Sequence, residues 1–493
     1  MEGERPQNSA KAARVDGDTF LGRLVAEEAG EHPGLSGFVP LSDGIDALGA
    51  RLILIDRAER SIDAQYYFIL NDVTGHLFVS RLLAAADRGV HVRLLVDDIA
   101  TRSLDVGMAE LDGHPNFEIR IFNPFSRRLG RILHFVMNFR RANRRMHNKS
   151  FTVDGVATVV GGRNIGAEYF AAREDVNFGD LDLLGFGPVA RDVGVAFDAY
   201  WNDALAAPIA ELVRPARDPD AGLESLRARI AGSLEGLESS DYGEALRSTL
   251  LDRLQGMEGG VEWAPAHVVY DPPGKIRGEK VPGQIAGRLA TSLLHAIGKA
   301  ERELLVVSPY FVPLGVGVEL LGATRARGVR SIVLTNSLAS SDVVAVHSGY
   351  APFRIPLLRR GVELFESRSD ARMAGPIRAG AARSRSSLHA KIFVVDRRRL
   401  FVGSFNWDPR SVAINTEMGI MVDSPVLARR VAELVMALLP SAAWRVGETG
   451  SGRLRWSRTE AGRELSATRE PGAGFWRRLL AAILRWLPIR EQL

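Results

Sequence analysis

The fold is decided by the stretch Met146-His147-Asn148-Lys149-Ser150-Phe151-Thr152-Val153-Asp154-Gly155, which continues to Gly161-Gly162-Arg163-Asn164. A second copy reads His389-Ala390-Lys391-Ile392-Phe393-Val394-Val395-Asp396 and continues to Gly403-Ser404-Phe405-Asn406. In both copies the Lys follows the His at +2, the Asp at +7 and the Asn at +17, and the copies lie 242 residues apart. Four polar residues at fixed spacing, found twice in one chain, indicate an internal repeat.

The residues around both copies predict alternating strands and helices. Ahead of the first copy we expect a helix over 43–58, a strand over 61–69, a helix over 74–88 and a strand over 90–97. Ahead of the second we expect a helix over 287–300, a strand over 303–310, a helix over 317–327 and a strand over 329–336. This order is typical of an α/β fold with crossover helices, and the chain reads as two versions of one domain.

Changes in composition suggest the domain boundaries. We expect a flexible leader over 1–33 with one short helix, a first domain over 34–214, a helical connector over 215–265 and a second domain over 266–446. A polar, flexible tether over 447–473 and an amphipathic helix over 474–493 then complete the chain.

Each polar motif is predicted to lie on a β-hairpin, since Asp154-Gly155 is a strong turn signal between two β-rich runs. Residues i and i+2 of a strand share a face, so each His projects beside its Lys. Asp154 and Asp396 lie at the far ends of the hairpins, roughly 17 Å from the Lys, and are expected to hold the turns. Asn164 and Asn406 follow the returning strands and come back to the His end.

Two His, two Lys and two Asn on paired domains suit an anionic phosphate. Lys and Asn can neutralise and hydrogen-bond its non-bridging oxygens, while one His attacks phosphorus and the other transfers protons. A nucleophilic His needs an acceptor on its other ring nitrogen, and Asp180 and Glu417 are the available carboxylates. Protonated Lys is not a metal ligand, so we predict a reaction without metal or cofactor.

These residues resemble the phospholipase D superfamily, whose signature, His-x-Lys-x4-Asp-x6-Gly-[Gly/Ser]-x-Asn, is present twice. Residues 62–67, 147–151, 160–166, 346–350, 387–391, 403–411 and 415–417 are similar to the C-type branch of bacterial cardiolipin synthases. The resemblance covers residues 39–440. It implies two tandem phospholipase D-like domains, each a mixed β-sheet flanked by helices, forming a pseudo-twofold pair with one shared active site. By analogy His147 is the nucleophile and His389 the general acid and base, although the residues alone do not settle this assignment.

The composition is that of a soluble globular protein, with 46% hydrophobic and 25% charged residues and a formal charge of +4. The chain has no Cys, which excludes disulfides and thiolate chemistry. We find no apolar run at the N-terminus and no stretch of ~20 apolar residues, so we expect neither a signal peptide nor a spanning helix. The predicted location is peripheral, on the cytoplasmic face of the bacterial inner membrane.

Two segments outside the repeats predict contact with an anionic membrane. Residues 127–145 contain no acid and interleave apolar residues with seven arginines: Arg127, Arg128, Arg131, Arg140, Arg141, Arg144 and Arg145. Residues 475–487 combine Trp476 and Trp486 with Arg477 and Arg478 and are too short to span a bilayer. A nucleic-acid patch, a plain surface helix, and a C-terminal helix docked back onto the protein remain as alternatives.

The predicted function is a phosphatidyltransferase that makes cardiolipin from phosphatidylglycerol, with phosphatidylethanolamine as a second candidate substrate. Transfer of the same intermediate to water would make a phospholipase D that releases phosphatidic acid. A nuclease is a third hypothesis, which the apolar basic segments disfavour, so we expect no nucleic-acid partner. A non-catalytic lipid-binding protein is a fourth, and both intact His/Lys pairs argue against it. The sequence does not identify the donor, a protein partner or the oligomeric state.

Overall fold

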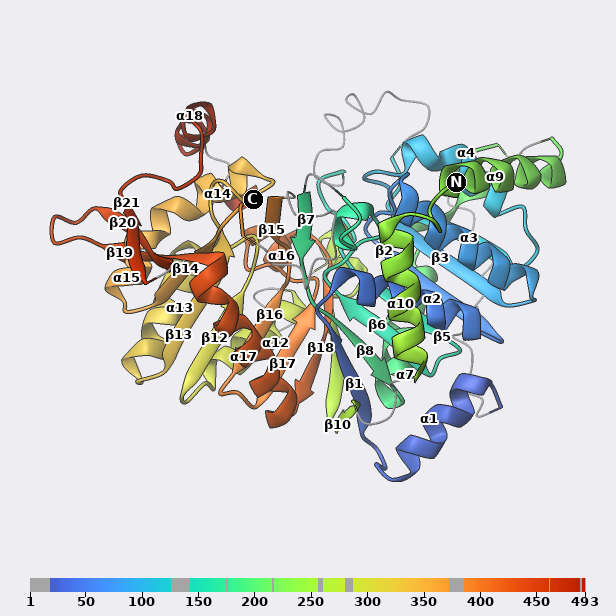
Figure 1. Cartoon of the computed structure of the whole chain (residues 1–493), viewed down its shortest axis with the longest axis horizontal. Helices are drawn as coiled ribbons and strands as arrows, with labels where there is room; N and C mark the ends of the chain where they lie inside the picture. Colours follow the sequence, from blue (N-terminus) through green and yellow to red (C-terminus); the bar gives the residue numbers. More distant parts are fainter. Residues whose placement is uncertain are drawn as a thin grey trace.

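The computed structural model describes residues 18–125, 142–173, 176–214, 217–255, 260–279, 287–371, 385–460, 462–487 and 490–492. Two large sheets stand beside each other, with helices packed around them (Figure 1). We call residues 18–264, built on the nine-stranded sheet, lobe 1, and residues 266–492, built on the ten-stranded sheet, lobe 2.

The sheet of lobe 1 is mixed, with parallel strands at its centre and antiparallel ones beside them. Across the sheet its strands are β10 (Glu262–Ala264), β1 (Ser36–Leu41), β8 (Asp182–Phe186), β6 (Ala157–Gly161), β5 (Ser150–Val153), β2 (Ser61–Tyr66), β3 (His91–Asp97), β4 (Phe117–Phe122) and β9 (Ala206–Pro208). The helices of this lobe are α1 (Phe20–Gly30), α2 (Gly44–Arg57), α3 (Val73–Asp87), η1 (Arg102–Leu104), α4 (Asp105–Leu111), η2 (Ala167–Tyr169), α7 (Pro188–Trp201), α8 (Ile209–Leu212), α9 (Pro219–Leu234) and α10 (Asp241–Gln255).

Lobe 2 repeats eight strands of lobe 1 in the same order across its sheet. They are β11 (Ala266–Tyr270), β18 (Met418–Asp423), β17 (Arg399–Gly403), β16 (Ile392–Val395), β12 (Glu303–Val307), β13 (Arg330–Asn336), β14 (Glu363–Ser367) and β19 (Ala443–Glu448), followed by β20 (Leu454–Glu460) and β21 (Arg463–Ala467). Its helices are α11 (Gly274–Arg277), α12 (Arg288–Gly298), α13 (Leu314–Ala326), α14 (Val344–Tyr350), η3 (Ala351–Phe353), α15 (Arg354–Arg359), α16 (Pro409–Ala413), α17 (Pro425–Ala442), α18 (Phe475–Leu484) and η4 (Arg490–Gln492).

The predicted elements ahead of each motif are all present, and side-chain caps mark where two of the helices, α2 and α3, begin. The Asp43 side chain accepts hydrogen bonds from the amides of Ile45 and Asp46 and starts α2 where the pattern placed it. The predicted strand over 61–69 is shorter than expected, because β2 ends at Tyr66. Ile69 instead makes a single bridge to Ile165, next to Asn164.

The polar segment after residue 447 has a different structure from the one predicted. We expected a flexible tether there, yet β20 and β21 extend the second sheet as a hairpin. The buried Trp456 anchors this hairpin, since its indole nitrogen donates to the buried carboxylate of Glu366 at 2.9 Å. The connector also departs from its predicted limit, because β10 joins the sheet of lobe 1 beside β1.

One buried hydrophobic cluster spans the two lobes. Phe38, Val160 and Leu183 of lobe 1 pack in a single buried cluster with Val307, Ile392 and other side chains of lobe 2. A two-stranded parallel sheet of β7 (Val176–Gly179) and β15 (Arg385–Leu388) also joins the lobes, and it lies at the junction in Figure 1. The two halves are therefore held in a fixed relation, as one shared site requires.

Candidate active site

Main-chain pairing between the lobes places both histidines. Leu388 of β15 is paired with Gly179 of β7, and the next amide, that of His389, donates to the Gly179 carbonyl at 2.8 Å. In the other half the amide of His147 donates to the carbonyl of Thr416 at 2.9 Å. The residues after Gly179 and Thr416 are Asp180 and Glu417. Each His is therefore held beside an acidic residue of the opposite lobe.

The two histidine–carboxylate pairs are crossed. Nδ1 of His147 lies 2.9 Å from Oε2 of Glu417, and Nδ1 of His389 lies 2.6 Å from Oδ2 of Asp180. The sequence pointed to both carboxylates without showing which ring each one meets. In a neutral imidazole this contact places the proton on Nδ1 and leaves the lone pair of Nε2 for chemistry.

The second half of each motif supports the carboxylates. A Cβ on Gly162 would lie 2.5 Å from Oδ1 of Asp180, so only glycine leaves room for that carboxylate. The equivalent position in lobe 2 is Ser404, whose hydroxyl donates to Oε2 of Glu417 at 2.5 Å. Ser411 donates to Oε1 of Glu417 at 2.7 Å. The residue at the Gly-or-Ser position of the motif thus either leaves room for the carboxylate or donates a hydrogen bond to it. This carboxylate contacts the His of the opposite lobe.

Burial sets the resting charges of the site. It lowers the pKa of His147 to about 4 against the attraction of Glu417, and it lowers the pKa of His389 to about 4 with the help of nearby Lys391. Burial alone would raise the pKa of Asp180, but His389, Lys391 and Arg163 together hold it below its usual value. The pKa of Glu417 is lowered in the same way by His147 and Lys149. Near neutral pH the site therefore holds neutral imidazoles beside ionised carboxylates.

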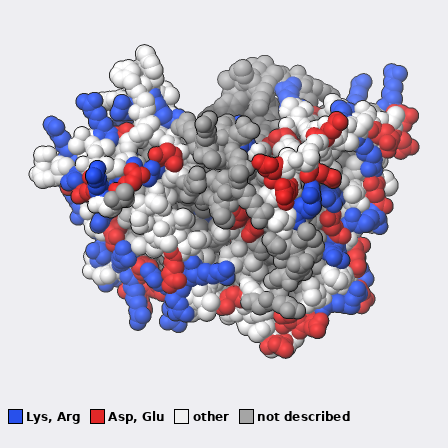
Figure 2. Space-filling model, in the orientation of Figure 1, with Lys and Arg blue, Asp and Glu red and all other residues white. Residues whose placement is uncertain are grey.

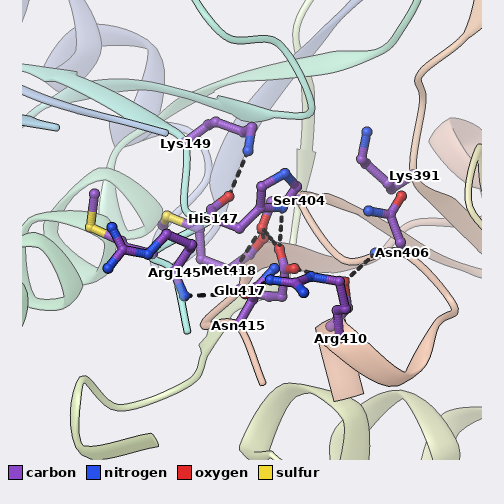
Figure 3. A network of polar contacts seen from close by, with 12 residues as sticks. Arg145, His147, Lys149, Lys391, Ser404, Asn406, Arg410, Asn415, Glu417 and Met418 are labelled. Carbon is purple, nitrogen blue, oxygen red and sulfur yellow. Dashed lines mark hydrogen bonds and ion pairs between the residues drawn. The ribbon is translucent and has the colours of Figure 1, made fainter. Parts of the chain in front are cut away.

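Lys149 and Lys391 approach from the two lobes on either side of the His147 ring (Figure 3). Each side-chain nitrogen donates to the main-chain carbonyl of its own motif's His, at 2.7 Å from Lys149 to His147. Burial lowers the pKa of Lys391 to about 8 in spite of the nearby carboxylates of Asp180 and Glu417. Burial also lowers the pKa of Lys149. A bound anion would raise both pKa values again, and it would meet the two amino groups with little screening by water.

The two motif asparagines follow the returning strands of their hairpins, Asn164 after β6 and Asn406 after β17. Nδ2 of Asn164 donates to the Tyr169 hydroxyl at 3.0 Å. Oδ1 of Asn164 and Oδ1 of Asn406 are buried, and no partner for either atom is found among the described residues. Unused hydrogen-bonding capacity on buried amides is costly unless a ligand or water completes it.

Aromatic rings that the sequence analysis did not single out frame both imidazoles. The ring centroid of Tyr67 lies 5.0 Å from that of His147, while Tyr169 and Phe178 lie 5.1 and 5.2 Å from His389. Tyr169 and Phe178 belong to lobe 1 and His389 to lobe 2, so this packing also crosses the junction. In the sequence, Tyr67 ends the stretch 62–67 that resembles the family, and Phe178 stands two residues before Asp180.

The aspartates of the two motifs stand apart from the imidazoles. Asp154 has φ 51° and Asp396 has φ 56°, which places both in hairpin turns. The Asp154 carboxylate accepts from the amides of residues 59, 60 and 61. The Asp396 carboxylate accepts from those of residues 301, 302 and 303. Each carboxylate ties the tip of its hairpin to the start of the neighbouring strand.

Metal binding has no evident site in the part of the chain that is described. No group of three or more His, Asp or Glu side chains is placed there to hold a metal ion. Protonated lysine is not a metal ligand, so Lys149 and Lys391 offer no donor atoms to a cation in this site. The absence of metal from the reaction stays a prediction.

Five of the predicted membrane-contacting arginines, Arg127, Arg128, Arg131, Arg140 and Arg141, lie outside the described residues. Arg144 and Arg145 of the same segment are described, and they point inward. Arg145 is 2% exposed and pairs with Asp97 at 3.1 Å, and Arg144 donates to the carbonyl of Lys275 at 2.8 Å. The prediction of a basic membrane surface is therefore wrong for these two, because buried acceptors hold them.

The C-terminal helix α18 is docked by one face and exposed on the other. Arg477 donates to the carbonyl of Leu338 at 2.6 Å and to that of Ser341, which corrects its predicted role at a membrane. Arg478 is half-buried, while Trp476 and Trp486 are 77% and 89% exposed. No helix in the described ranges is both long and apolar enough to cross a bilayer.

Both lobes of the chain are similar to known proteins. The family model described as "Cardiolipin synthase, PLD-like domain" matches residues 52–201 and 293–438, one match in each lobe. The chain belongs to this family. It is 39% identical over 480 residues to cardiolipin synthase C of Escherichia coli (strain K12), covering 95% of this chain and 98% of that one. It is 25% identical over 423 residues to a cardiolipin synthase of Alkalihalophilus pseudofirmus, covering 85% of this chain and 69% of the other.

A solved structure shows the same fold at much lower identity. The phosphatidylserine synthase of Haemophilus influenzae Rd KW20 superposes with a TM-score of 0.58 at 12% identity, covering 95% of this chain and all of that one. The predicted class, an α/β protein of two tandem phospholipase D-like domains with mixed sheets, is confirmed.

Proposed function

We propose that this protein is a cardiolipin synthase, which transfers a phosphatidyl group from one phospholipid to the glycerol hydroxyl of phosphatidylglycerol. The observation that carries the proposal is the crossed pair of contacts His147–Glu417 and His389–Asp180, which makes one two-histidine site from both lobes. Similarity to cardiolipin synthase C of Escherichia coli over nearly the whole of both chains supports the choice of reaction.

In the first step Nε2 of His147 attacks phosphorus and the bond from phosphorus to the donor's headgroup oxygen breaks. Protonated His389 gives its proton to that oxygen, which leaves as an alcohol. A bound phosphate favours this protonated form, because a nearby negative charge raises the pKa of an imidazole. The assignment of His147 as nucleophile follows the resemblance stated above.

In the second step His389 removes a proton from the glycerol hydroxyl of phosphatidylglycerol. The resulting oxygen attacks phosphorus, the phosphorus–nitrogen bond breaks, and His147 returns to its neutral form. Lys149, Lys391, Asn164 and Asn406 hold the non-bridging oxygens, on which charge accumulates in both transition states.

Burial of the histidines favours transfer over hydrolysis. The side chains of His147 and His389 are only 12% and 10% exposed. A site that excludes water protects a reactive intermediate from hydrolysis until the acceptor lipid arrives. Hydrolysis to phosphatidic acid remains the second candidate, and the test below separates the two.

The test incubates the protein with vesicles of phosphatidylglycerol, with and without phosphatidylethanolamine, and identifies the lipid products by mass spectrometry. Cardiolipin is expected. Phosphatidic acid in its place would show a phospholipase D, and DNA cleavage without lipid turnover would show a nuclease. The dependence on phosphatidylethanolamine identifies the donor.

The proposed location is the cytoplasmic surface of the bacterial inner membrane, with α18 as the membrane contact. Its outer face exposes Phe475, Trp476, Leu480 and Ile483. Figure 2 shows this projecting helix as largely uncharged, with Lys and Arg side chains beside it. An apolar face with neighbouring cations suits an anionic membrane.

Replacing both Trp476 and Trp486 by Ser tests this location while leaving the docking residue Arg477 in place. We expect sedimentation with anionic vesicles to weaken by about tenfold, since Trp favours the headgroup level. Val195→Ser, on an exposed apolar residue of α7, is the matched control and should bind as the natural protein does. Equal binding by all three proteins would exclude α18 as the contact.

A further inference from the structure

A cavity of about 470 Å³ lies in lobe 1 among α3, α4 and α9, at the carboxyl ends of β2 and β3. Most of its lining is aliphatic, including Ile69, Leu70, Val79, Leu104, Met108 and Ile230. Apolar cavities of about 150 Å³ already stay dry and bind small apolar molecules. A cavity of about three times that size is large enough for a longer hydrocarbon.

The polar side chains of the lining are largely occupied with protein partners. Nε2 of His76 lies 2.7 Å from Oδ1 of Asn71, and Nδ1 of His76 lies 2.6 Å from the hydroxyl of Ser233. Thr101 donates to Asp98 at 2.5 Å, and Arg229 pairs with Glu110. Because these groups are already satisfied, the cavity is suited to an apolar chain and not to a charged headgroup.

One wall of the cavity is bonded to the segment that carries Asn164. The amide of Leu70 donates at 2.8 Å to the carbonyl of Ile165, which is the residue after Asn164. Phe68 directly precedes the wall residue Ile69, and the centroid of its ring lies 6.1 Å from that of Tyr169. Tyr169 in turn packs on His389. The cavity and the catalytic site are therefore separated by a few side chains.

Lobe 2 fills the equivalent space with aromatic rings. Phe311 and Trp407 stand 242 residues after Ile69 and Ile165, at the spacing of the motifs themselves, and each pair forms a bridge. The rings of Phe311 and Trp407 lie 5.7 Å apart. Gly317, the counterpart of Gly75 in the cavity wall, faces the Trp407 indole, from which an added Cβ would lie 3.2 Å away.

The helix after the next strand shows the same replacement. α4 begins eight residues after the end of β3, and α14 begins eight residues after the end of β13. The last residue of α4 is Leu111, which lines the cavity, while the last residue of α14 is Tyr350. The Tyr350 ring is buried, with its centroid 5.9 Å from that of Phe311. Aliphatic residues around a cavity in lobe 1 thus correspond to packed rings in lobe 2.

The cavity also lies on the side of the molecule that carries α18. In Figure 1, α4 and α18 stand along the same edge, on either side of the junction between the lobes. Val106 of α4 lines the cavity and is 64% exposed, which marks the mouth. A chain that leaves a membrane at this edge could enter the cavity beside the catalytic site.

We propose that this cavity receives one acyl chain of the phospholipid whose phosphate lies between His147 and His389. The inference rests on the proposed function and adds an asymmetry to it: one of the two lipid substrates is held by its chain in lobe 1. Among the described residues of lobe 2, the packed rings of Phe311 and Trp407 occupy the equivalent position, so the second lipid is held there through its polar part.

Photo-crosslinking of the full-length protein tests the proposal. The probe is phosphatidylglycerol with a diazirine near the end of one acyl chain, presented in phosphatidylglycerol vesicles. Illumination should label peptides covering residues 69–79, 101–111 and 226–230. Gly107→Leu should reduce this labelling at least fivefold, since a Cβ there would touch only Leu226 at 3.6 Å and the rest of the side chain would enter the cavity. Val106→Trp at the mouth is a second obstructing variant, for use if the first is unstable.

Gly232→Leu in α9 is the matched control, because an added Cβ at Gly232 meets nothing within 4 Å. It should label as the natural protein does. Absence of label from the cavity peptides, or labelling unchanged in both obstructing variants, would overturn the inference. Cardiolipin is measured in the same samples: product without cavity label rejects only the acyl site, whereas cavity label without any lipid product rejects only the proposed reaction.

Discussion

Lobe 1 and lobe 2 share eight strands in the same order and one polar motif, but they differ in the side chains that pack outside this motif. Both place a His beside the other lobe's carboxylate, and both tie the hairpin tip with an Asp. Outside this frame, lobe 1 has aliphatic side chains around a cavity under α9, while lobe 2 has packed rings beneath α14, on which α18 docks. The residues of the catalytic frame are thus alike in the two lobes because they share one chemistry, whereas the side chains outside the frame differ.

The strongest test of the shared frame is removal of each histidine. His147→Ala and His389→Ala should each lower kcat by more than about 10⁴-fold, because one loses the nucleophile and the other the proton carrier. If either variant keeps a tenth of the activity, the lobes do not form one site.

The same two variants can separate the roles of the histidines. With a donor lipid labelled at phosphorus and rapid denaturation in alkali, we expect His389→Ala to retain label on the protein and His147→Ala to retain none. The reverse pattern would assign the nucleophile to lobe 2.

Substitution of the crossed carboxylates is the next largest effect. Asp180→Asn and Glu417→Gln should each reduce kcat by about 10² to 10⁴-fold, since the partner imidazole loses the charge that fixes its proton on Nδ1. The acid limb of the pH–rate profile should move as well, which a purely structural defect would not cause. Asp112→Asn, whose carboxylate caps a distant main-chain amide, is the control and should leave the profile in place.

The turn aspartates allow the lobes to be compared in stability. Asp154 is 2% exposed, whereas the bonds of Asp396 are largely at the surface. Asp154→Ala should lower the free energy of unfolding by about 3 kcal/mol and Asp396→Ala by about 1 kcal/mol, because water can replace only the exposed carboxylate. Urea unfolding measures both, and equal losses would contradict this difference in environment.

The smallest expected effect is a shift of the alkaline limb. Activity should rise with pH as the nucleophile His147 loses its proton near pH 4, and it should fall near pH 8 as Lys391 loses its charge. A lysine is charged below its pKa, so Lys391→Arg should extend relative activity to higher pH, whatever its absolute rate. An unchanged alkaline limb would assign that limb to another group.

Much of the site was readable from the sequence because its residues repeat. The spacing of His147, Lys149 and Asn164 was enough to place them together on a hairpin, and a second copy excluded chance. The crossing of Asp180 and Glu417 was not readable, because it depends on main-chain pairing between segments more than 200 residues apart. Contacts across a junction leave no periodicity in either partner.

In the rest of the fold, too, some elements could be predicted from the sequence and others could not. Helices α2 and α3 were predicted from the sequence pattern, whereas β20 and β21 were not, because their residues are mostly exposed and polar. Arg145 and Arg477 looked like surface cations, and only the structure shows the buried main-chain and carboxylate acceptors that hold them. Composition reveals the charge of an arginine without revealing the direction in which it points.

The crossed pairing has a consequence for how the protein is made. Synthesis proceeds from the N-terminus, and His147 emerges long before Glu417, its partner. A ribosome-bound chain that has folded only lobe 1 lacks the carboxylate, the second histidine and the second lysine. An enzyme that acts on phospholipids would therefore stay inert through most of its own translation, and it would become active only once lobe 2 has closed on lobe 1.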